Sequence, residues 1–246
     1  IIINCHNVKA DVTTLQQDEK GRYCINTADD YYFFLSKVNK APYSTSAVVL
    51  TNDIEITNEK KGTGMFQGKF DGQGHTITYS ATDRSFNKKN ITAFAFSLGA
   101  NGILENVKIY IKETKIYIGD SIVPYTAIKS NRGIVKGVSV TGNVTLTCDE
   151  STNNWNLNIG SVSGEGTLEN CEFSINYNLQ SSMSSDEIAK KITDNKALWE
   201  ICQLGTKDSV SKIKYINCIS HGSYNSKISD VATSLSQVLD FDATYT

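Results

Sequence analysis

Polar and apolar residues alternate in several short segments of the chain, and three of these segments align without gaps. They are GILENVKIYI (102–111), GIVKGVSVTG (133–142) and GTLENCEFSI (166–175). Each reads glycine, any residue, apolar, polar, asparagine or glycine, apolar, polar, apolar. A period of two predicts a β-strand with one buried face. The segments begin 31 and 33 residues apart, a spacing typical of repeat architectures.

Two further segments extend this repeat. SKIKYINCIS (211–220) alternates in the same way after a longer insertion, and GHTITY (74–79) is an earlier copy. A propeller blade needs about four strands per repeat, whereas each of these units supplies two or three short strands between Asn and Gly turns. The pattern therefore favours the stacked turns of a parallel β-helix over a propeller.

The alternation also assigns residues to the core. Asn106 and Asn170 stand where a unit would turn a corner, and stacked asparagine side chains can hydrogen-bond along such a ladder. Nine side chains are expected to point inward in three stacked sets: Leu104, Val107 and Ile109; Val135, Val138 and Val140; Leu168, Cys171 and Phe173.

Two stretches, 26–40 and 184–205, follow the 3.6-residue period of a helix instead. Thr27 is the expected N-cap of the first, because Asp30 follows three residues later. Ser185 is the expected N-cap of the second. Their buried faces would be formed by Tyr31, Phe34, Leu35 and Val38 in the first helix and by Ile188, Ile192, Trp199 and Cys202 in the second.

These elements fit a single β-helix domain that spans the chain. A helix is expected to cover its N-terminal end, because an open solenoid end exposes core and strand edges. The amphipathic stretch 230–241 could cover the other end. The domain would divide into a capping helix (26–40), rungs (46–183), a helical insertion (184–205), and the last rung with a C-terminal cap (206–246), all within 1–246.

Three motifs follow one another between Tyr23 and Ile77: YCINTADDYYFFLSKVNK, AVVLTNDIEIT and GMFQGKFDGQGHTIT. Together they resemble the opening of GLUG-repeat surface proteins of bacterial type, and the likeness continues more loosely to Ile175. The namesake Gly-Leu-x-Gly element is degenerate in this chain, at AFAFSLGANG (93–102). The resemblance implies a right-handed parallel β-helix on an extracellular or cell-surface protein, with an accessory or adhesive role.

The glycine-rich segment FDGQGHTIT (70–78) lacks the spacing of a phosphate-binding loop and does not open a helix. We expect it to be a turn in which Gly72 and Gly74 adopt positive φ. Asp71 would accept a hydrogen bond from the backbone of the same turn. The strand that follows would place Ile77 in the core.

Charge and hydropathy argue against several classes of protein for this chain. The chain of 246 residues has 24 basic and 26 acidic side chains and a net charge of -2. It therefore has no basic excess with which to displace counterions from nucleic acid. No apolar run is long enough to span a membrane as a helix. The chain begins IIINCHNVKA without a signal-peptide pattern, so either a leader has been removed or the chain is an excised piece.

Cysteine usage points to an oxidising compartment. No CxxC pair occurs, which argues against a zinc ribbon. An even number of cysteines without metal spacing favours disulfides, with buried thiols as the alternative. A bond between Cys5 and Cys24 would clip the leading segment to the cap. The candidates are Cys5, Cys24, Cys148, Cys171, Cys202 and Cys218.

Two other features are candidates for modification and for assembly. Asn90 and Asn143 open N-x-Thr sequons and are candidates for N-glycosylation. The apolar run Ile1, Ile2 and Ile3 is a candidate for assembly, because an apolar strand can add to the sheet of a neighbouring subunit. It could equally fold back and complete the first rung of its own chain.

A catalytic interpretation depends on carboxylates, because β-helix lyases and glycosidases need a suitably placed pair or base. Asp53 and Asp71 lie in expected turns, where aspartate is common, and no Asp pair recurs on one rung face. Turn stabilisation is therefore favoured over catalysis. The remaining catalytic candidates are Asp83, Arg84 and His75.

The sequence gives little support to a metal site or a sugar-binding site. His6, His75 and His221 lie in separate segments without metal-ligand spacing, and CDESTNN (148–154) lacks the spacing of a calcium loop. No metal or cofactor is expected. Aromatic rings at rung edges could stack on sugars, although packing beneath loops is favoured. These residues are Tyr110, Tyr117, Tyr125, Trp155, Tyr177 and Tyr224.

The sequence thus predicts a non-enzymatic extracellular module with a structural or adhesive role, such as a subunit of a surface filament. Expected partners are copies of itself or cell-surface glycans, with no nucleic acid and no membrane insertion. The alternative is a carbohydrate-active enzyme, a polysaccharide lyase or glycosidase of pectate-lyase shape. An ice-binding solenoid would need a long flat threonine ladder, and SVTGNVTLT (139–147) alone is too short for one.

Overall fold

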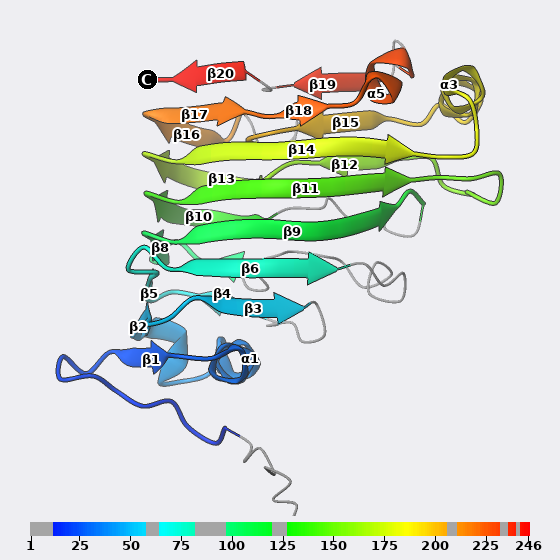
Figure 1. Cartoon of the computed structure of the whole chain (residues 1–246). Coiled ribbons are helices and arrows are strands. Elements are labelled where there is room, and N and C mark those ends of the chain that lie inside the picture. The colour runs from blue at the N-terminus through cyan, green and yellow to red at the C-terminus, as the bar shows by residue number, and fades with distance from the viewer. Residues whose placement is uncertain are drawn as a thin grey trace, which may run out of the picture.

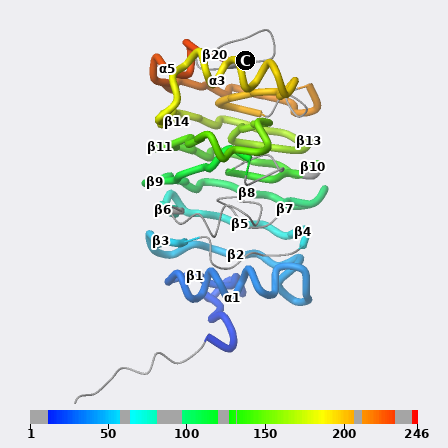
Figure 2. Tube along the Cα trace, turned by 90° about the vertical axis from the view of Figure 1, so that its right-hand side faces the viewer, coloured from blue at the N-terminus to red at the C-terminus, as the bar shows by residue number. Residues whose placement is uncertain are grey.

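The protein is mainly β, with parallel sheets. Neighbouring strands of each sheet lie one above another in an elongated stack, from β1 (Tyr23–Ile25) at one end to β20 (Asp242–Tyr245) at the other (Figure 1). Viewed from the side, the chain forms flat layers that repeat along the stack (Figure 2). The computed structural model describes residues 12–57, 64–81, 97–119, 127–205, 211–231, 236–239 and 242–246.

One parallel sheet, sheet A, runs along the stack. Its main strands are, in order, β1, β2 (Ala47–Leu50), β5 (Lys69–Asp71), β8 (Ile103–Glu105), β10 (Ile128–Lys136), β13 (Val162–Glu169) and β16 (Ile213–Ile216). Two short strands, β4 (Met65–Phe66) and β7 (Ser97–Leu98), pair with each other, and β7 also pairs with β10.

A second sheet, sheet B, lies beside it (Figure 1). Its main strands are, in order, β3 (Ile54–Thr57), β6 (Thr76–Ala81), β9 (Lys108–Tyr117), β11 (Ser139–Thr147), β14 (Glu172–Gln180), β17 (Cys218–His221) and β20. The short strand β18 (Ser223–Tyr224) also pairs with β14. Only the last pair in this series, β17 with β20, is antiparallel among the described residues.

A third and smaller sheet, sheet C, lies in the upper part of the stack (Figure 1). It is parallel and consists of β12 (Leu157–Ile159), β15 (Trp199–Cys202) and β19 (Ser236–Leu239).

The chain passes from sheet A to sheet B at one repeated corner. Two residues join β8 to β9, β10 to β11 and β13 to β14. The first of these two is Asn106, Gly137 or Asn170, with φ of 53°, 58° and 53°. Glycine and asparagine reach this left-handed conformation more readily than other residues. The predicted corner position is therefore confirmed, and the backbone explains why the pattern requires Asn or Gly there.

The alignment of the repeats is also confirmed by strand pairing. Gly133 pairs with Gly166, and Ile134 with Ile103, as the gapless alignment requires. The outer copies join the same ladders, because β16 pairs with β13 and β6 pairs with β9. All nine side chains expected to point inward are at most 2% exposed.

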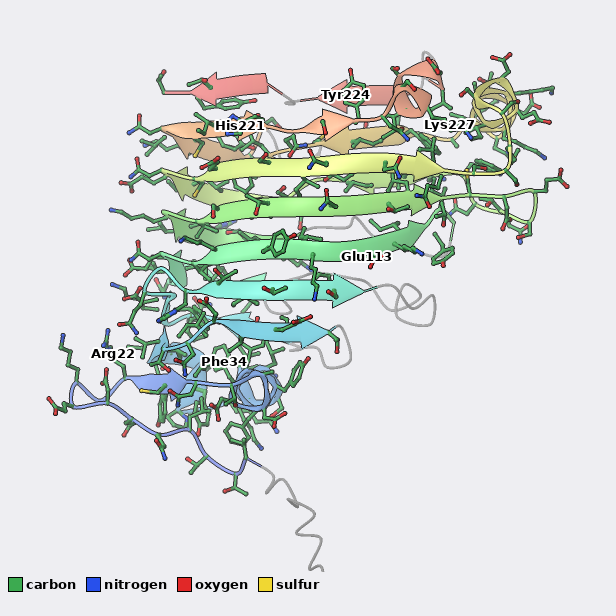
Figure 3. All side chains as sticks on the ribbon, viewed as in Figure 1. Arg22, Phe34, Glu113, His221, Tyr224 and Lys227 are labelled. Carbon is green, nitrogen blue, oxygen red and sulfur yellow. The ribbon has the colours of Figure 1, made fainter. Side chains whose placement is uncertain are left out.

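Helix α1 (Ala28–Lys37) lies at the N-terminal end of the stack, within the stretch expected to form a capping helix (Figure 1). The Thr27 hydroxyl accepts a hydrogen bond from the Asp30 N–H, and the Asp30 carboxylate accepts one from the Thr27 N–H. Figure 3 shows Phe34 on this helix at the lower end of the stack. Its ring centre lies 5.4 Å from that of Phe66 and 6.0 Å from that of Phe70, so the helix packs directly on the first rung.

The helix predicted at 184–205 is too long. Helix α3 (Ser185–Asp194) has Ser184, not Ser185, as its N-cap, and Lys196 has a φ of 50° just beyond its end. The following residues form β15, in which all four side chains are buried. A strand buried on both faces lacks alternation, so its apolar residues could be mistaken for the stripe of a helix.

The amphipathic stretch at 230–241 contains a strand, not a capping helix. Its described part includes β19, which pairs with β15 in sheet C. A helix of five residues, α5 (Ser226–Asp230), ends where the stretch begins. Residues 232–235 and 240–241 lie outside the described part of the chain.

The structure has no disulfide between any two of the cysteines that it describes, which are Cys24, Cys148, Cys171, Cys202 and Cys218. Four of these are buried, so they take the core positions that were the alternative to disulfide bonding. Cys5, the predicted partner of Cys24, lies outside the described residues.

Candidate functional site

The outer side of sheet B carries a continuous surface of uncharged polar side chains. These residues, called the hydroxyl–amide face below, are Ser139, Thr141, Asn143, Thr145 and Thr147 of β11 and Ser174, Asn176, Asn178 and Gln180 of β14. All are exposed or half-buried, and they alternate with buried residues along both strands. Strand alternation therefore places them all on the side of the sheet away from the core.

The strand register makes this surface regular. Thr141 is paired with Ser174, Asn143 with Asn176, and Thr145 with Asn178. Neighbouring strands are about 4.8 Å apart, and alternate residues on one strand are about 6.8 Å apart. Side chains that are distant in sequence thus form a two-dimensional array of hydroxyl and amide groups.

Hydrogen bonds between rungs hold part of this array in place. The Asn176 amide donates to the Asn143 amide oxygen at 3.2 Å, and Ser223 Oγ donates to Asn176 Oδ1 at 2.7 Å. The Asn225 amide donates to Asn178 Oδ1 in the next ladder. These side chains are partly fixed before any ligand binds. Binding would therefore cost less entropy for ordering the side chains of the protein.

Aromatic side chains lie beside this face. Tyr110 of β9 is paired with Thr141 and is 39% exposed, and Tyr117 is paired with Thr147 and is half-buried. Among the other aromatic candidates, Trp155 and Tyr177 are buried, which confirms the packing interpretation for these two. Tyr224 is exposed, and Tyr125 lies outside the described residues.

Charged residues begin at the edges of this face. Figure 3 shows Glu113 on β9 and His221 on β17, on either side of β11 and β14. His221 Nε2 lies 2.9 Å from Glu172 Oε1, and Lys112 Nζ lies 3.3 Å from Glu55 Oε1. Charged residues thus lie on the strands next to β11 and β14.

The outer side of sheet A has a different character, because oppositely charged residues pair between its rungs. Lys69 Nζ lies 2.7 Å from Glu105 Oε1, and Lys136 Nζ lies 3.3 Å from Glu169 Oε1. Arg132 also pairs with Glu165, at 2.9 Å. These charges neutralise each other along the stack instead of presenting a field of one sign.

The candidate catalytic carboxylates that the structure describes are engaged in turns. Asp53 accepts the Thr76 N–H at 2.8 Å and lies 3.2 Å from His75 Nδ1. The hydrogen bond from the Thr76 N–H is the main reason that the pKa of Asp53 lies below its usual value. The hydrogen bond with His75 lowers this pKa further. A carboxyl group with a lowered pKa is a poor general acid. Asp83 and Arg84 lie outside the described residues.

Asp71 stabilises its own turn, as predicted. Its Oδ1 accepts the Gln73 N–H at 3.0 Å and lies 3.3 Å from the Asn106 amide nitrogen. Of the two glycines in the turn, Gly74 has the expected positive φ of 83°. Gly72 does not have a positive φ, and is needed for space instead, because a Cβ atom there would lie 2.5 Å from the Asn106 carbonyl oxygen.

No cluster of three or more metal-ligating side chains occurs among the described residues. His75 and His221 each lie beside one carboxylate, in different rungs, and His6 lies outside the described part. The loop at 148–154 uses Asp149 to accept the Ser151 N–H, at 2.8 Å. In the same described residues, no helix is long and apolar enough to cross a membrane.

The modification and assembly candidates are only partly described. Asn143 is exposed on β11, in the middle of the hydroxyl–amide face. A glycan on Asn143 would therefore cover this face. Asn90 and the run Ile1, Ile2 and Ile3 lie outside the described residues, so both stay predictions.

Sequence reasoning missed the hydroxyl–amide face. A signal was present, because SVTGNVTLT and EFSINYNLQ place small polar residues at every second position. Comparisons with protein-family models, curated proteins and solved structures found no match to this chain.

Proposed function

We propose that this protein is a non-enzymatic, right-handed parallel β-helix that acts outside the cell as an adhesive or structural module. Its hydroxyl–amide face would bind uncharged glycan chains of a cell surface. The resemblance of residues 23–77 to GLUG-repeat proteins supports the extracellular location. The passage of the chain between sheets A and B in each layer supports the solenoid.

One observation carries the adhesive role: nine outward residues of β11 and β14 in sheet B are uncharged and polar, whereas charged residues of opposite sign pair between rungs on the outer side of sheet A. Sugar hydroxyl groups both donate and accept hydrogen bonds. The side chains of Ser, Thr, Asn and Gln also do both. Tyr110 adds an exposed ring on which the apolar side of a sugar can stack.

The shape of the site also favours binding over catalysis. The face belongs to a sheet whose side chains are partly fixed by hydrogen bonds between rungs. A glycan would lie across several rungs and make many weak contacts. The carboxylates of Asp53 and Asp71 are engaged with the backbone of their turns, so the proposal gives them no catalytic step.

The experiment compares one bulky charged substitution on each sheet. Thr141→Arg is placed on the hydroxyl–amide face, and Thr167→Arg is its matched control on β13 of sheet A. Binding is measured on a panel of neutral and charged glycans and insoluble polysaccharides, and melting curves check the folding of both variants. The protein is produced without N-glycans, because a glycan on Asn143 would cover the face.

We expect the wild type and Thr167→Arg to bind a neutral glycan, and Thr141→Arg to bind it at least about tenfold more weakly. Equal binding by both variants would show that this face is not the site. Failure of the wild type to bind any glycan would remove the adhesive proposal. Shortening of the bound polysaccharide would support the enzyme alternative instead.

A further inference from the structure

The row of core side chains that follows the corner ends in two cysteines. The pairings of β9, β11, β14 and β17 begin one residue later in each layer, and they therefore place Val138 next to Val107, Cys171 next to Val138 and Cys218 next to Cys171. Ile219 N–H donates to the Cys171 carbonyl oxygen at 3.0 Å, which fixes the two cysteines as neighbours in adjacent layers. They are 2% and 0% exposed.

Their spacing suits a disulfide bond. Adjacent strands of a sheet lie about 4.8 Å apart, and Cα atoms of bonded cysteines are about 4.4–6.8 Å apart. Both side chains also point to the same side of their strands, into the core. We infer that Cys171 and Cys218 form a disulfide bond under oxidising conditions. This bond would link the layer that contains β17 to the layer below it.

The surroundings of the two sulfur atoms support this assignment. Cys171 Sγ lies 3.3 Å from the Glu169 carbonyl oxygen, and Cys218 Sγ lies 3.4 Å from that of Leu168. A hydrogen bond between the two thiols lowers the pKa of Cys218 and raises that of Cys171. The two thiols are thus close enough to interact directly.

The oxidant would be a small disulfide such as oxidised glutathione. During folding, the thiolate of either cysteine attacks one of its sulfur atoms and expels one small thiolate, which takes up a proton. The thiol of the other cysteine then loses its proton, attacks the protein sulfur atom of the mixed disulfide, and expels the second small thiol. Two protein thiols are thereby oxidised by two electrons to one disulfide, and one small disulfide is reduced to two thiols.

The bond would close the longest of the chain segments that join equivalent positions in these adjacent layers. Between the two cysteines the chain forms β14, α3, β15 and β16 before it returns to the next layer, whereas the unit below forms only β11, β12 and β13 between Val138 and Cys171. A cross-link that closes a longer loop removes more entropy from the unfolded chain. The disulfide is therefore expected to stabilise the upper end of the stack most.

The test refolds the reduced, denatured full chain in a mixture of oxidised and reduced glutathione, because the folded thiols are buried. Peptide mapping without reductant identifies any cross-link, and denaturant titration measures stability. Cys171→Val and Cys218→Val are the test variants, since valine occupies the equivalent position in two lower layers. Cys148→Ala is the control, because Cys148 lies outside this row.

We expect a Cys171–Cys218 peptide in the wild type and in Cys148→Ala, and in neither valine variant. Oxidation should lower the unfolded fraction of the wild type by roughly tenfold or more, and reductant should reverse this. Alkylation of both cysteines after oxidative refolding would overturn the inference. So would pairing of either one with another cysteine, or loss of folded protein under oxidising conditions.

Discussion

The outer faces of sheets A and B share one backbone pattern and one core, yet they present different chemistry to solvent. In sheet A, charges of opposite sign meet between rungs, as in Lys69 with Glu105 and Lys136 with Glu169. In the middle of sheet B, the equivalent positions hold Ser, Thr, Asn and Gln, and the contacts between rungs are hydrogen bonds between neutral groups.

This difference distinguishes the positions that folding constrains from those that are available for function. Inward positions and corners must satisfy the same packing and backbone demands in every layer, so both sheets meet them in the same way. Outward positions are less constrained. Surface ion pairs contribute little stability, so either chemistry would suffice for folding. The choice of neutral hydrogen-bonding groups on one face only is what directs the functional proposal to sheet B.

The largest effect should come from a charge in the core that both faces share. Val107 is 1% exposed, so Val107→Asp would bury a carboxylate without a partner. We expect a loss of about 4 kcal/mol or more and no folded protein. Circular dichroism and the soluble yield measure this. Thr141→Asp, on the outer side of sheet B, is the control and should melt cooperatively, whereas a folded Val107→Asp variant would contradict the register.

The corner between the two faces should be the next most sensitive place. Asn170 has a φ of 53° and accepts a hydrogen bond from the Asn217 amide at 3.3 Å. Asn170→Ala should lose about 1–2 kcal/mol, because alanine is strained in the left-handed conformation. Asn170→Gly should lose less, since glycine already occupies this corner at Gly137. Equal losses in denaturant titrations would show that backbone conformation is not the reason for the Asn-or-Gly pattern.

The same comparison explains which features could be read from the sequence. Alternation and the Asn-or-Gly corner were sufficient to align the layers and to place Val107, Val138 and Cys171 in the core. They failed at β15, because a strand buried on both faces has no alternation. They also missed the hydroxyl–amide face, because only the register between strands brings Asn143 beside Asn176.

A smaller effect should distinguish the two kinds of contact between rungs. A double-mutant cycle on Lys136 and Glu169 should give a coupling of about 0.2–1 kcal/mol that falls as salt is added. The corresponding cycle on Asn143 and Asn176 should be insensitive to salt, because both groups are neutral. If both couplings fell equally with salt, the contrast between charged and neutral faces would not explain their energetics.

The smallest effect concerns pH at the lower edge of sheet B. The pKa of Asp53 is lowered in the folded protein, so the unfolded chain binds a proton first as the pH falls. The contribution of Asp53 to stability is therefore present above the ordinary pKa of about 3.9 and is lost as the pH falls through the folded value. Asp53→Asn should flatten the pH dependence of the melting temperature in this range. An unchanged slope would contradict this role.

The most direct test of the account reads both faces in one unmodified molecule. Tyr110 on sheet B is 39% exposed and Met65 on sheet A is 45% exposed, so hydroxyl radicals can oxidise both. Oxidation is followed by mass spectrometry with and without a saturating neutral glycan that the wild type binds. The account predicts that the glycan lowers the oxidation of Tyr110 and does not change the oxidation of Met65. Protection of Met65 alone, or of neither residue, would contradict the assignment of the binding face to sheet B.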